Sequence, residues 1–203
     1  MRYVQSTQEL ASLYGQKSEM SLRKETDFLT DEYQRLIGLS PFVVLATTGG
    51  GGMDCSPKGD GPGFVTVLDP KTLLIPDRRG NNRLDSLNNI IEDPRVGLLF
   101  LIPGAGETLR VNGTARITDH EPWRRRFEVN GRAPNLVIEV AVTSAYFHCS
   151  KAILRSDLWN PDVRVDGSLV PTCGQMLSEI TAGAVDGDEV DRTYPQRQLD
   201  NLY

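Results

Sequence analysis

A polar loop at residues 77–83 holds the side chains of this chain that are best suited to chemistry. It reads Asp-Arg-Arg-Gly-Asn-Asn-Arg and directly precedes a short predicted helix. The N–H groups and the partial positive charge at a helix N-terminus favour an anion, and each arginine can bind two phosphate oxygens. The loop is therefore a candidate phosphate site. The cations and amide donors that would hold the anion include Arg78, Asn81, Asn82 and Arg83, and Asp77 opens the loop.

The same loop also fits a purely structural role. Arginine side chains in loops are mostly solvated. Asn82 suits the N-cap of the following helix, because an asparagine oxygen accepts from free backbone N–H groups there. The loop residues alone leave both interpretations open.

Strands are the elements that must position this loop. Alternating or continuous apolar residues predict seven strands, at residues 42–48, 53–58, 64–68, 72–75, 96–102, 107–117 and 136–148. These strands do not alternate with helices, so a doubly wound parallel sheet is disfavoured. We therefore expect a mainly β fold, an antiparallel barrel of six to seven strands with short peripheral helices.

The pattern divides the chain into three segments. Residues 1–40 read as helical, with Ser6 and Thr30 before the helix starts. Residues 41–160 form the predicted barrel domain, with short helices at 120–129 and 151–158 capped by Asp119 and Ser150. Residues 161–203 form an extension that we expect to pack on the barrel or on a partner subunit. Its acidic stretch 186–200 is expected either to be poorly ordered or to lie along a partner.

Composition excludes several classes of function. The 203 residues carry a net charge of −5, which gives no electrostatic support to nucleic-acid binding. No apolar run is long enough to span a membrane, and no secretory signal is recognised. The three cysteines, Cys55, Cys149 and Cys173, are far apart, which favours a reducing cytoplasm over a disulfide scaffold.

Familiar catalytic and metal motifs are missing. The chain has no dinucleotide fingerprint, P-loop, CxxC, HExxH or GxSxG sequence. The neighbours His148 and Cys149 would point to opposite faces of a strand, and His148 reads as a satisfied core histidine. We therefore expect no metal site, and the sequence identifies no catalytic side chain.

Six segments together resemble the flavin-binding split-barrel family related to pyridoxamine 5′-phosphate oxidase. They are FVVLAT at 42–47, DCSPKGD at 54–60, DRRGNNRL at 77–84, NIIEDP at 89–94, VGLLF at 96–100 and TLRVNG at 108–113. Their order is more specific than any one of them, and the resemblance covers residues 40–160. It implies a homodimeric split barrel that binds FMN at the subunit interface.

The resemblance also implies roles for individual residues. The first hairpin meets the flavin through Cys55, Ser56 and Lys58, with Pro57 between them. The loop that begins at Pro76 and Asp77 holds the phosphate through Arg78, Asn81, Asn82 and Arg83. The other subunit brings Glu107 or Thr108 to the ring. Arg155 and Trp159 sit where members of the family bring C-terminal groups near the cofactor.

Simpler interpretations exist for some of these residues. Lys58 would be an exposed hairpin lysine, since lysine is mostly exposed. Cys55 reads better as a small packed residue than as a reactive thiol. Trp159 would be a buried aromatic residue.

The end of the chain departs from the family. True pyridoxamine phosphate oxidases carry an Arg-His-Asp-Arg-like stretch that holds the substrate phosphate, and residues 193–203 contain none. The working hypothesis is an FMN-dependent oxidoreductase acting on an unidentified small substrate. The alternatives are a flavin- or haem-binding carrier or sensor without turnover, and a deazaflavin-dependent reductase on the same barrel.

Overall fold

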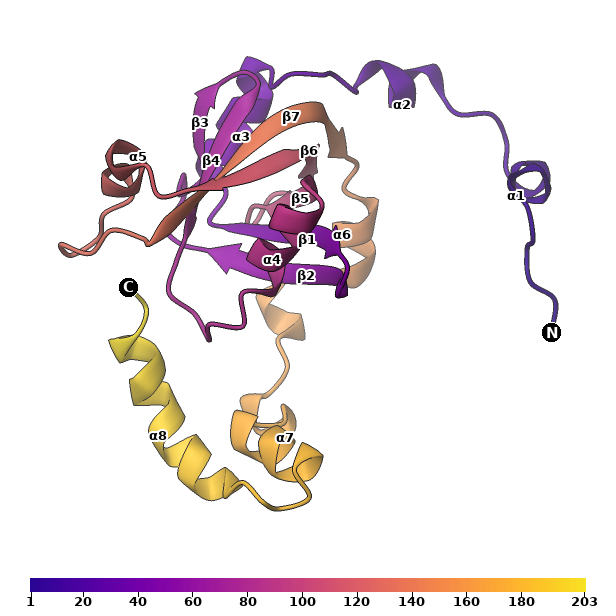
Figure 1. Cartoon of the computed structure of the whole chain (residues 1–203). Helices are drawn as coiled ribbons and strands as arrows, with labels where there is room; N and C mark the ends of the chain where they lie inside the picture. The colour runs from indigo at the N-terminus through magenta and orange to yellow at the C-terminus, as the bar shows by residue number, and fades with distance from the viewer.

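A seven-stranded antiparallel sheet forms the centre of the computed structural model, which describes residues 1–203 (Figure 1). The strands are β1 Phe42–Gly49, β2 Gly52–Gly59, β3 Thr66–Asp69, β4 Thr72–Asp77, β5 Arg95–Leu101, β6 Thr108–Thr118 and β7 Leu136–His148. Their order across the sheet is β2-β1-β5-β6-β7-β4-β3. The predicted mainly β split barrel with peripheral helices is confirmed.

The core follows from the two-residue period of the strands. In β1, Val43 and Leu45 are buried, and in β6, Leu109 and Val111 are buried, while the residues between them face outward. One cluster of 21 buried residues fills the barrel. The register between β6 and β7 shifts at Gly113, where a Cβ atom would lie 2.2 Å from a backbone oxygen of β7, so only glycine fits there.

Two helices pack against the barrel. Helix α3 (Asp31–Leu39) is capped by Thr30, as predicted, and buries Tyr33 and Ile37. Helix α4 (Asp85–Glu92) is held by Asn89, whose Nδ2 donates to Thr47 Oγ1 of β1 at 3.1 Å. The sheet and α4 therefore fix the two sides of the 77–83 loop.

Two shorter helices flank the barrel. Helix α5 (Glu121–Arg126) begins after His120 rather than after Asp119, so the predicted cap is wrong by one residue. Helix α6 (Lys151–Ser156) begins after Ser150, but the Ser150 side chain makes no capping hydrogen bond.

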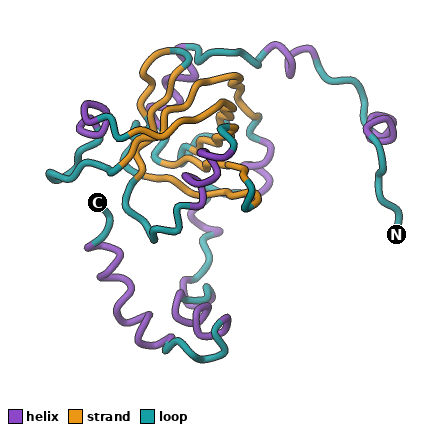
Figure 2. The backbone as a smooth tube through the Cα atoms, viewed as in Figure 1, coloured by secondary structure: helices purple, strands orange, loops and turns teal.

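The terminal segments reach away from the sheet, as the tube trace in Figure 2 shows. Helices α1 (Thr7–Leu13) and α2 (Glu19–Arg23) contain no buried residue. After the barrel come η1 (Pro161–Val163), η2 (Gly167–Leu169), α7 (Cys173–Ile180) and α8 (Gly187–Asp200). The acidic stretch is thus a helix, started by Asp186, whose side chain accepts from Glu189 N. No helix in the structure has the length and apolar character needed to cross a membrane.

Helices α7 and α8 pack closely because their contact point is built from glycines. A Cβ atom on Gly174 would lie 2.0 Å from the backbone oxygen of Gly187. The freed space lets the Asp191 carboxylate accept from Gly174 N at 2.7 Å. The two helices form a hairpin that stands beside the barrel.

Candidate functional site

A cleft of about 930 Å³ opens between β2, β4 and the start of α4. Its lining comprises Ser56, Lys58, residues 77–87, residues 132–136 and Tyr203. Five basic side chains and two carboxylate side chains line it, an excess of three positive charges in a chain whose net charge is −5. The cleft therefore attracts anions, although the molecule as a whole does not.

Register between strands explains how distant residues reach this cleft. Strand β4 pairs with β7, and Asp77 lies opposite Leu136. The turn at residues 132–136 consequently lies beside the 77–83 loop, and Arg132 joins the arginines of that loop. Sequence reasoning missed Arg132, because no local pattern links it to residues so far away.

The loop enters α4 through strained backbone. Asn82 and Leu84 adopt left-handed conformations, with φ of 60° and 61°. Asparagine tolerates this conformation, whereas it costs Leu84 about 1–2 kcal/mol. The N-cap is Leu84, and no side chain caps the helix. The interpretation of Asn82 as only an N-cap is therefore wrong. The first N–H groups of α4 lack a side-chain acceptor, and Asp85, Ser86 and Leu87 line the cleft.

Arg78 is the most firmly held cation of the loop. Its Nε donates to Asp60 Oδ2 at 2.7 Å and its Nη1 to the Phe127 backbone oxygen at 2.6 Å. The Arg78 side chain is 16% exposed and that of Asp60 10%. Burial by itself would raise the pKa of Asp60, but hydrogen bonds from Gly61 N, Tyr203 and Arg78 outweigh it and lower that pKa.

Lys58 is also paired. Its Nζ lies 3.0 Å from Asp77 Oδ1, and its side chain is only 20% exposed, so the interpretation of an exposed hairpin lysine is wrong. Ser56 and Lys58 line the cleft, whereas Cys55 and Pro57 alternate with them on the other side of β2. Cys55 is exposed, contrary to the expectation of a packed thiol.

Two other arginines of the loop, Arg79 and Arg83, are exposed. Arg83 pairs with Asp85 at 2.8 Å, and this hydrogen bond raises the pKa of Arg83, yet the Arg83 side chain is 74% exposed. Asn81 Oδ1 accepts from Arg83 N at 3.1 Å and so shapes the turn. Arg79 lines the cleft and has no hydrogen bond or ion pair.

Two serines bring hydroxyl oxygens to the cleft. Asp54 Oδ2 accepts from Ser56 at 2.9 Å and from Ser86 at 2.5 Å. Both hydroxyl protons point to Asp54, which leaves the serine oxygens as acceptors. Sequence reasoning missed Ser86. Its position in the first turn of the predicted helix, directly after the loop, was the signal that could have identified it.

The remaining predicted residues lie outside the cleft. Pro76 is buried within β4, Glu107 and Thr108 lie at the start of β6, and Arg155 lies in α6. Trp159 Nε1 donates to the Ala105 backbone oxygen at 2.7 Å, which holds the end of α6 beside the turn before β6. Within one chain, the predicted site residues therefore divide into two groups.

His148 is not the satisfied core histidine that the sequence suggested. Its Nε2 is buried and has no hydrogen-bond partner. Burial and then the nearby cations Arg110 and Lys24 lower the pKa of His148, so the ring is neutral at pH 7. No group of three or more His, Cys, Asp or Glu side chains that could hold a metal ion is found.

Comparison with known proteins gives one family and several similar folds. The sequence profile described as Pyridoxamine 5'-phosphate oxidase matches residues 29–149. No curated protein matches the chain. The crystal structure of a variant of HupZ from Group A Streptococcus is 20% identical, with a TM-score of 0.50, over 59% of this chain and 99% of that one. An FMN-binding protein from Syntrophomonas wolfei is 11% identical, with a TM-score of 0.46, over 59% and 85%.

Proposed function

The chain belongs to the pyridoxamine 5′-phosphate oxidase family, and from that premise we propose that it is an FMN-binding oxidoreductase acting on a small substrate. The observation that carries the proposal is the basic cleft, into which the uncapped N-terminus of α4 opens. A phosphate monoester is the anion that suits such a helix terminus flanked by arginines.

Arg79 and Arg83 are the side chains that we assign to the phosphate. Arg79 has no partner to give up, and Arg83 has only the exposed Asp85. An anion that binds Arg79 and Arg83 would therefore leave no buried group without its partner. Arg78 keeps its hydrogen bonds to Asp60 and Phe127 and positions the loop.

The rest of the cleft suits a flavin ring. When bound, the flavin supplies the redox chemistry, and the protein supplies position and electrostatics. Ser56 and Ser86 present acceptor oxygens, because Asp54 takes both of their protons. Lys58, paired with Asp77 in the same cleft, is the side chain that we assign to tuning the reduction potential of a bound flavin. We assign FMN rather than FAD, because the loop offers a single phosphate-sized cluster of cations.

We also propose that the protein is a two-fold homodimer that completes the site. Glu107, Thr108, Arg155 and Trp159 lie outside the cleft of their own chain, and a second copy would bring them to the flavin of its partner. Closed two-fold dimers are the commonest oligomers. A monomer mass in light scattering of the flavin-loaded protein would contradict this assembly. The three free cysteines support a reducing cytoplasm.

Pyridoxamine phosphate should be a poor substrate. Between Val185 and Tyr203, four aspartates and one glutamate stand against two arginines, so this segment disfavours a second phosphate. A single-turnover experiment under air, at saturating pyridoxamine phosphate, follows the formation of pyridoxal phosphate. Rapid, saturable product formation would show that a second anion site exists.

A titration with FMN tests the cofactor proposal with a matched pair of variants. Arg83 and Arg125 are both exposed and both paired to a nearby carboxylate, but only Arg83 lines the cleft. Arg83→Ala should weaken FMN binding roughly tenfold to hundredfold, as expected for a charged hydrogen bond, and Arg125→Ala should not. Equal titration curves, or no quenching of FMN fluorescence by the unmodified protein, would contradict the proposal.

A further inference from the structure

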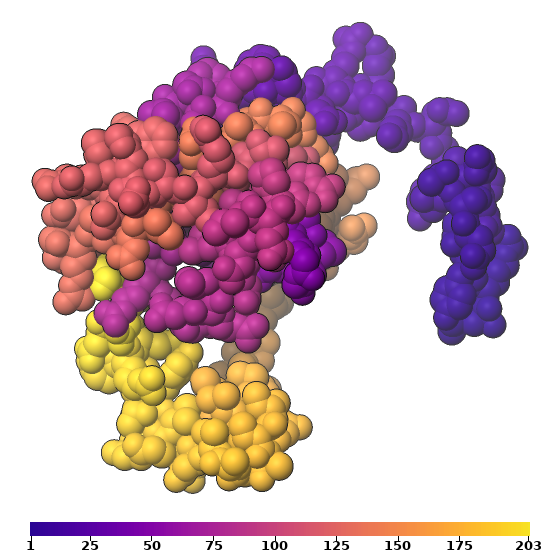
Figure 3. Space-filling view, in the orientation of Figure 1, coloured from indigo at the N-terminus to yellow at the C-terminus, as the bar shows by residue number.

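The C-terminal segment is hydrogen-bonded to the barrel at one residue, Tyr203. Between residues 171–203 and residues 1–160 there are two hydrogen bonds, and both involve Tyr203. Its hydroxyl donates to Asp60 Oδ1 at 2.9 Å, and its backbone oxygen accepts from Arg132 Nη1 at 2.9 Å. The end of the chain, yellow in Figure 3, reaches the barrel surface there.

Tyr203 lines the cleft and contacts two of its cations, Arg78 and Arg132. Its ring centroid lies 5.3 Å from the guanidinium carbon of Arg78, a cation–π contact. Its backbone oxygen takes from Arg132 the hydrogen bond that an anion oxygen would take. An aromatic ring and an acceptor oxygen thus lie in the cleft together, and these are the chemical features of a ligand that carries both an aromatic ring and a phosphate.

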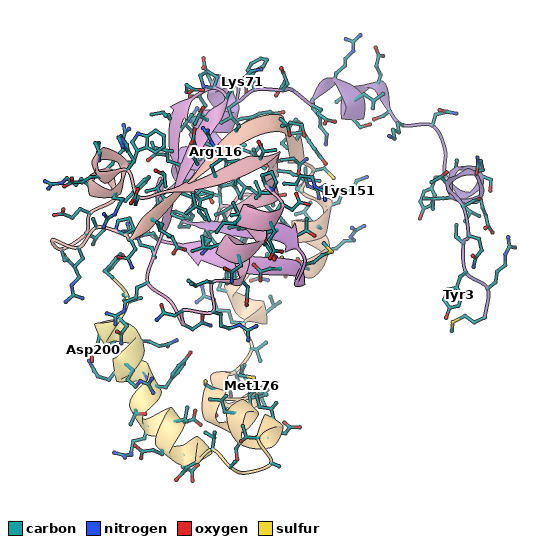
Figure 4. All side chains as sticks on the ribbon, viewed as in Figure 1. Tyr3, Lys71, Arg116, Lys151, Met176 and Asp200 are labelled. Carbon is teal, nitrogen blue, oxygen red and sulfur yellow. The ribbon has the colours of Figure 1, made fainter.

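The rest of the segment can leave without exposing a core. Helix α8 contains no buried residue, and the element that it packs against is α7. Figure 4 shows Met176 of α7 well away from the barrel, whereas Asp200 lies at the end that approaches it. Detachment at Tyr203 would therefore break its contacts with Asp60, Arg132 and Arg78 and would uncover no buried residue of α8.

We infer that Tyr203 is a tethered competitor for the cleft, a cover that must leave before FMN enters. This inference rests on the proposed function. When the cover is closed in some molecules, the apparent association constant for FMN is the intrinsic one multiplied by the fraction of molecules that are open. If the cover is closed in nine molecules of ten, its removal should tighten FMN binding about tenfold.

The test compares two tyrosines of the same segment in the full chain. Tyr203→Ala removes the ring beside Arg78 and the hydroxyl that donates to Asp60, and keeps the backbone oxygen. Tyr194→Ala is the control, because Tyr194 in α8 has no hydrogen bond to the barrel. Stopped-flow and equilibrium quenching of FMN fluorescence should show about tenfold tighter and faster binding for Tyr203→Ala only. Hydrogen exchange should show that FMN increases the exchange of amides at the end of α8 in the unmodified protein.

The possible outcomes separate the two proposals. Weaker FMN binding by Tyr203→Ala, or FMN-induced protection of the end of α8, would show that Tyr203 is a ligand contact and would overturn the inference. Equal affinities for the unmodified protein and both variants would overturn the inference and leave FMN binding intact. Absence of FMN binding in every variant would remove the proposed function, and the competition with it.

Discussion

The cations of the cleft are held in two opposite ways, and we call the paired group the anchored end and the unpaired one the open end. At the anchored end, Arg78 and Lys58 are half-buried and are paired with Asp60 and Asp77. At the open end, Arg79 is unpaired. A cation whose partners are buried costs much to remove and is held in one position, whereas an exposed cation can turn to a ligand at little cost. The difference supports our proposal that the anchored end shapes the site and the open end binds the phosphate.

Removing the anchor should have the largest effect on stability. Arg78→Ala leaves Asp60 without its ion-pair partner and Phe127 without a donor to its backbone oxygen. We expect a loss of about 2–3 kcal/mol in the free energy of unfolding, below the range for a fully buried pair. Urea denaturation measures it. The control is Arg116→Ala, because Arg116 pairs with Glu139 but its side chain is 80% exposed. Equal urea midpoints for the two variants would remove the distinction between the two ends.

Removing the free cation should affect binding and leave stability unchanged. Arg79→Ala should weaken FMN binding roughly tenfold, the low end of the effect of a charged hydrogen bond. Arg126 is a matched control, because it is exposed and has no hydrogen bond or ion pair, but lies outside the cleft. Isothermal titration of both variants with FMN measures the difference in affinity. If Arg79→Ala instead lowered the urea midpoint, the open end would have a structural role.

The support of the open end should have a smaller effect on stability. Asn89 of α4 donates to Thr47 Oγ1 at 3.1 Å and to the Gly52 backbone oxygen at 3.3 Å. Asn89→Ala leaves these acceptors unpaired and should cost about 1–2 kcal/mol in urea denaturation. Asn88→Ala, one residue earlier on an exposed face of α4, is the control and should change little. A larger loss for Asn88→Ala would contradict this view of α4.

The smallest expected effect is that of acid on the stability that Asp60 contributes at the anchored end. The folded-state pKa of Asp60 is lower than its ordinary value of 3.8. The stability that ionised Asp60 contributes is therefore present above about pH 3.8 and is lost as the pH falls through the lower, folded-state pKa. The stability difference between the unmodified protein and Asp60→Asn should be constant from about pH 5 to about pH 7 and shrink below pH 3.8. A difference that stays constant below pH 3.8 would contradict the shift.

Local patterns in the sequence determined the strands and the position of the anion loop. The alternation in residues 42–48, 107–117 and 136–148 depends on neighbouring residues only, because side chains in a strand alternate between its faces. The family profile spans residues 29–149, where these patterns are strongest. Helix α8 was missed, because it is polar on all sides and contains Pro195, so it lacks the apolar period of a packed helix.

Tertiary structure alone decided which cations are fixed and which are free. Arg132 reaches the cleft because β4 pairs with β7, and Arg78 is held because Asp60 and the Phe127 backbone oxygen meet it there. Tyr203 meets Asp60 although 143 positions separate the two residues along the chain. Pairing, burial and competition between partners depend on which segments the fold brings together, and no spacing within the 77–83 loop encodes them.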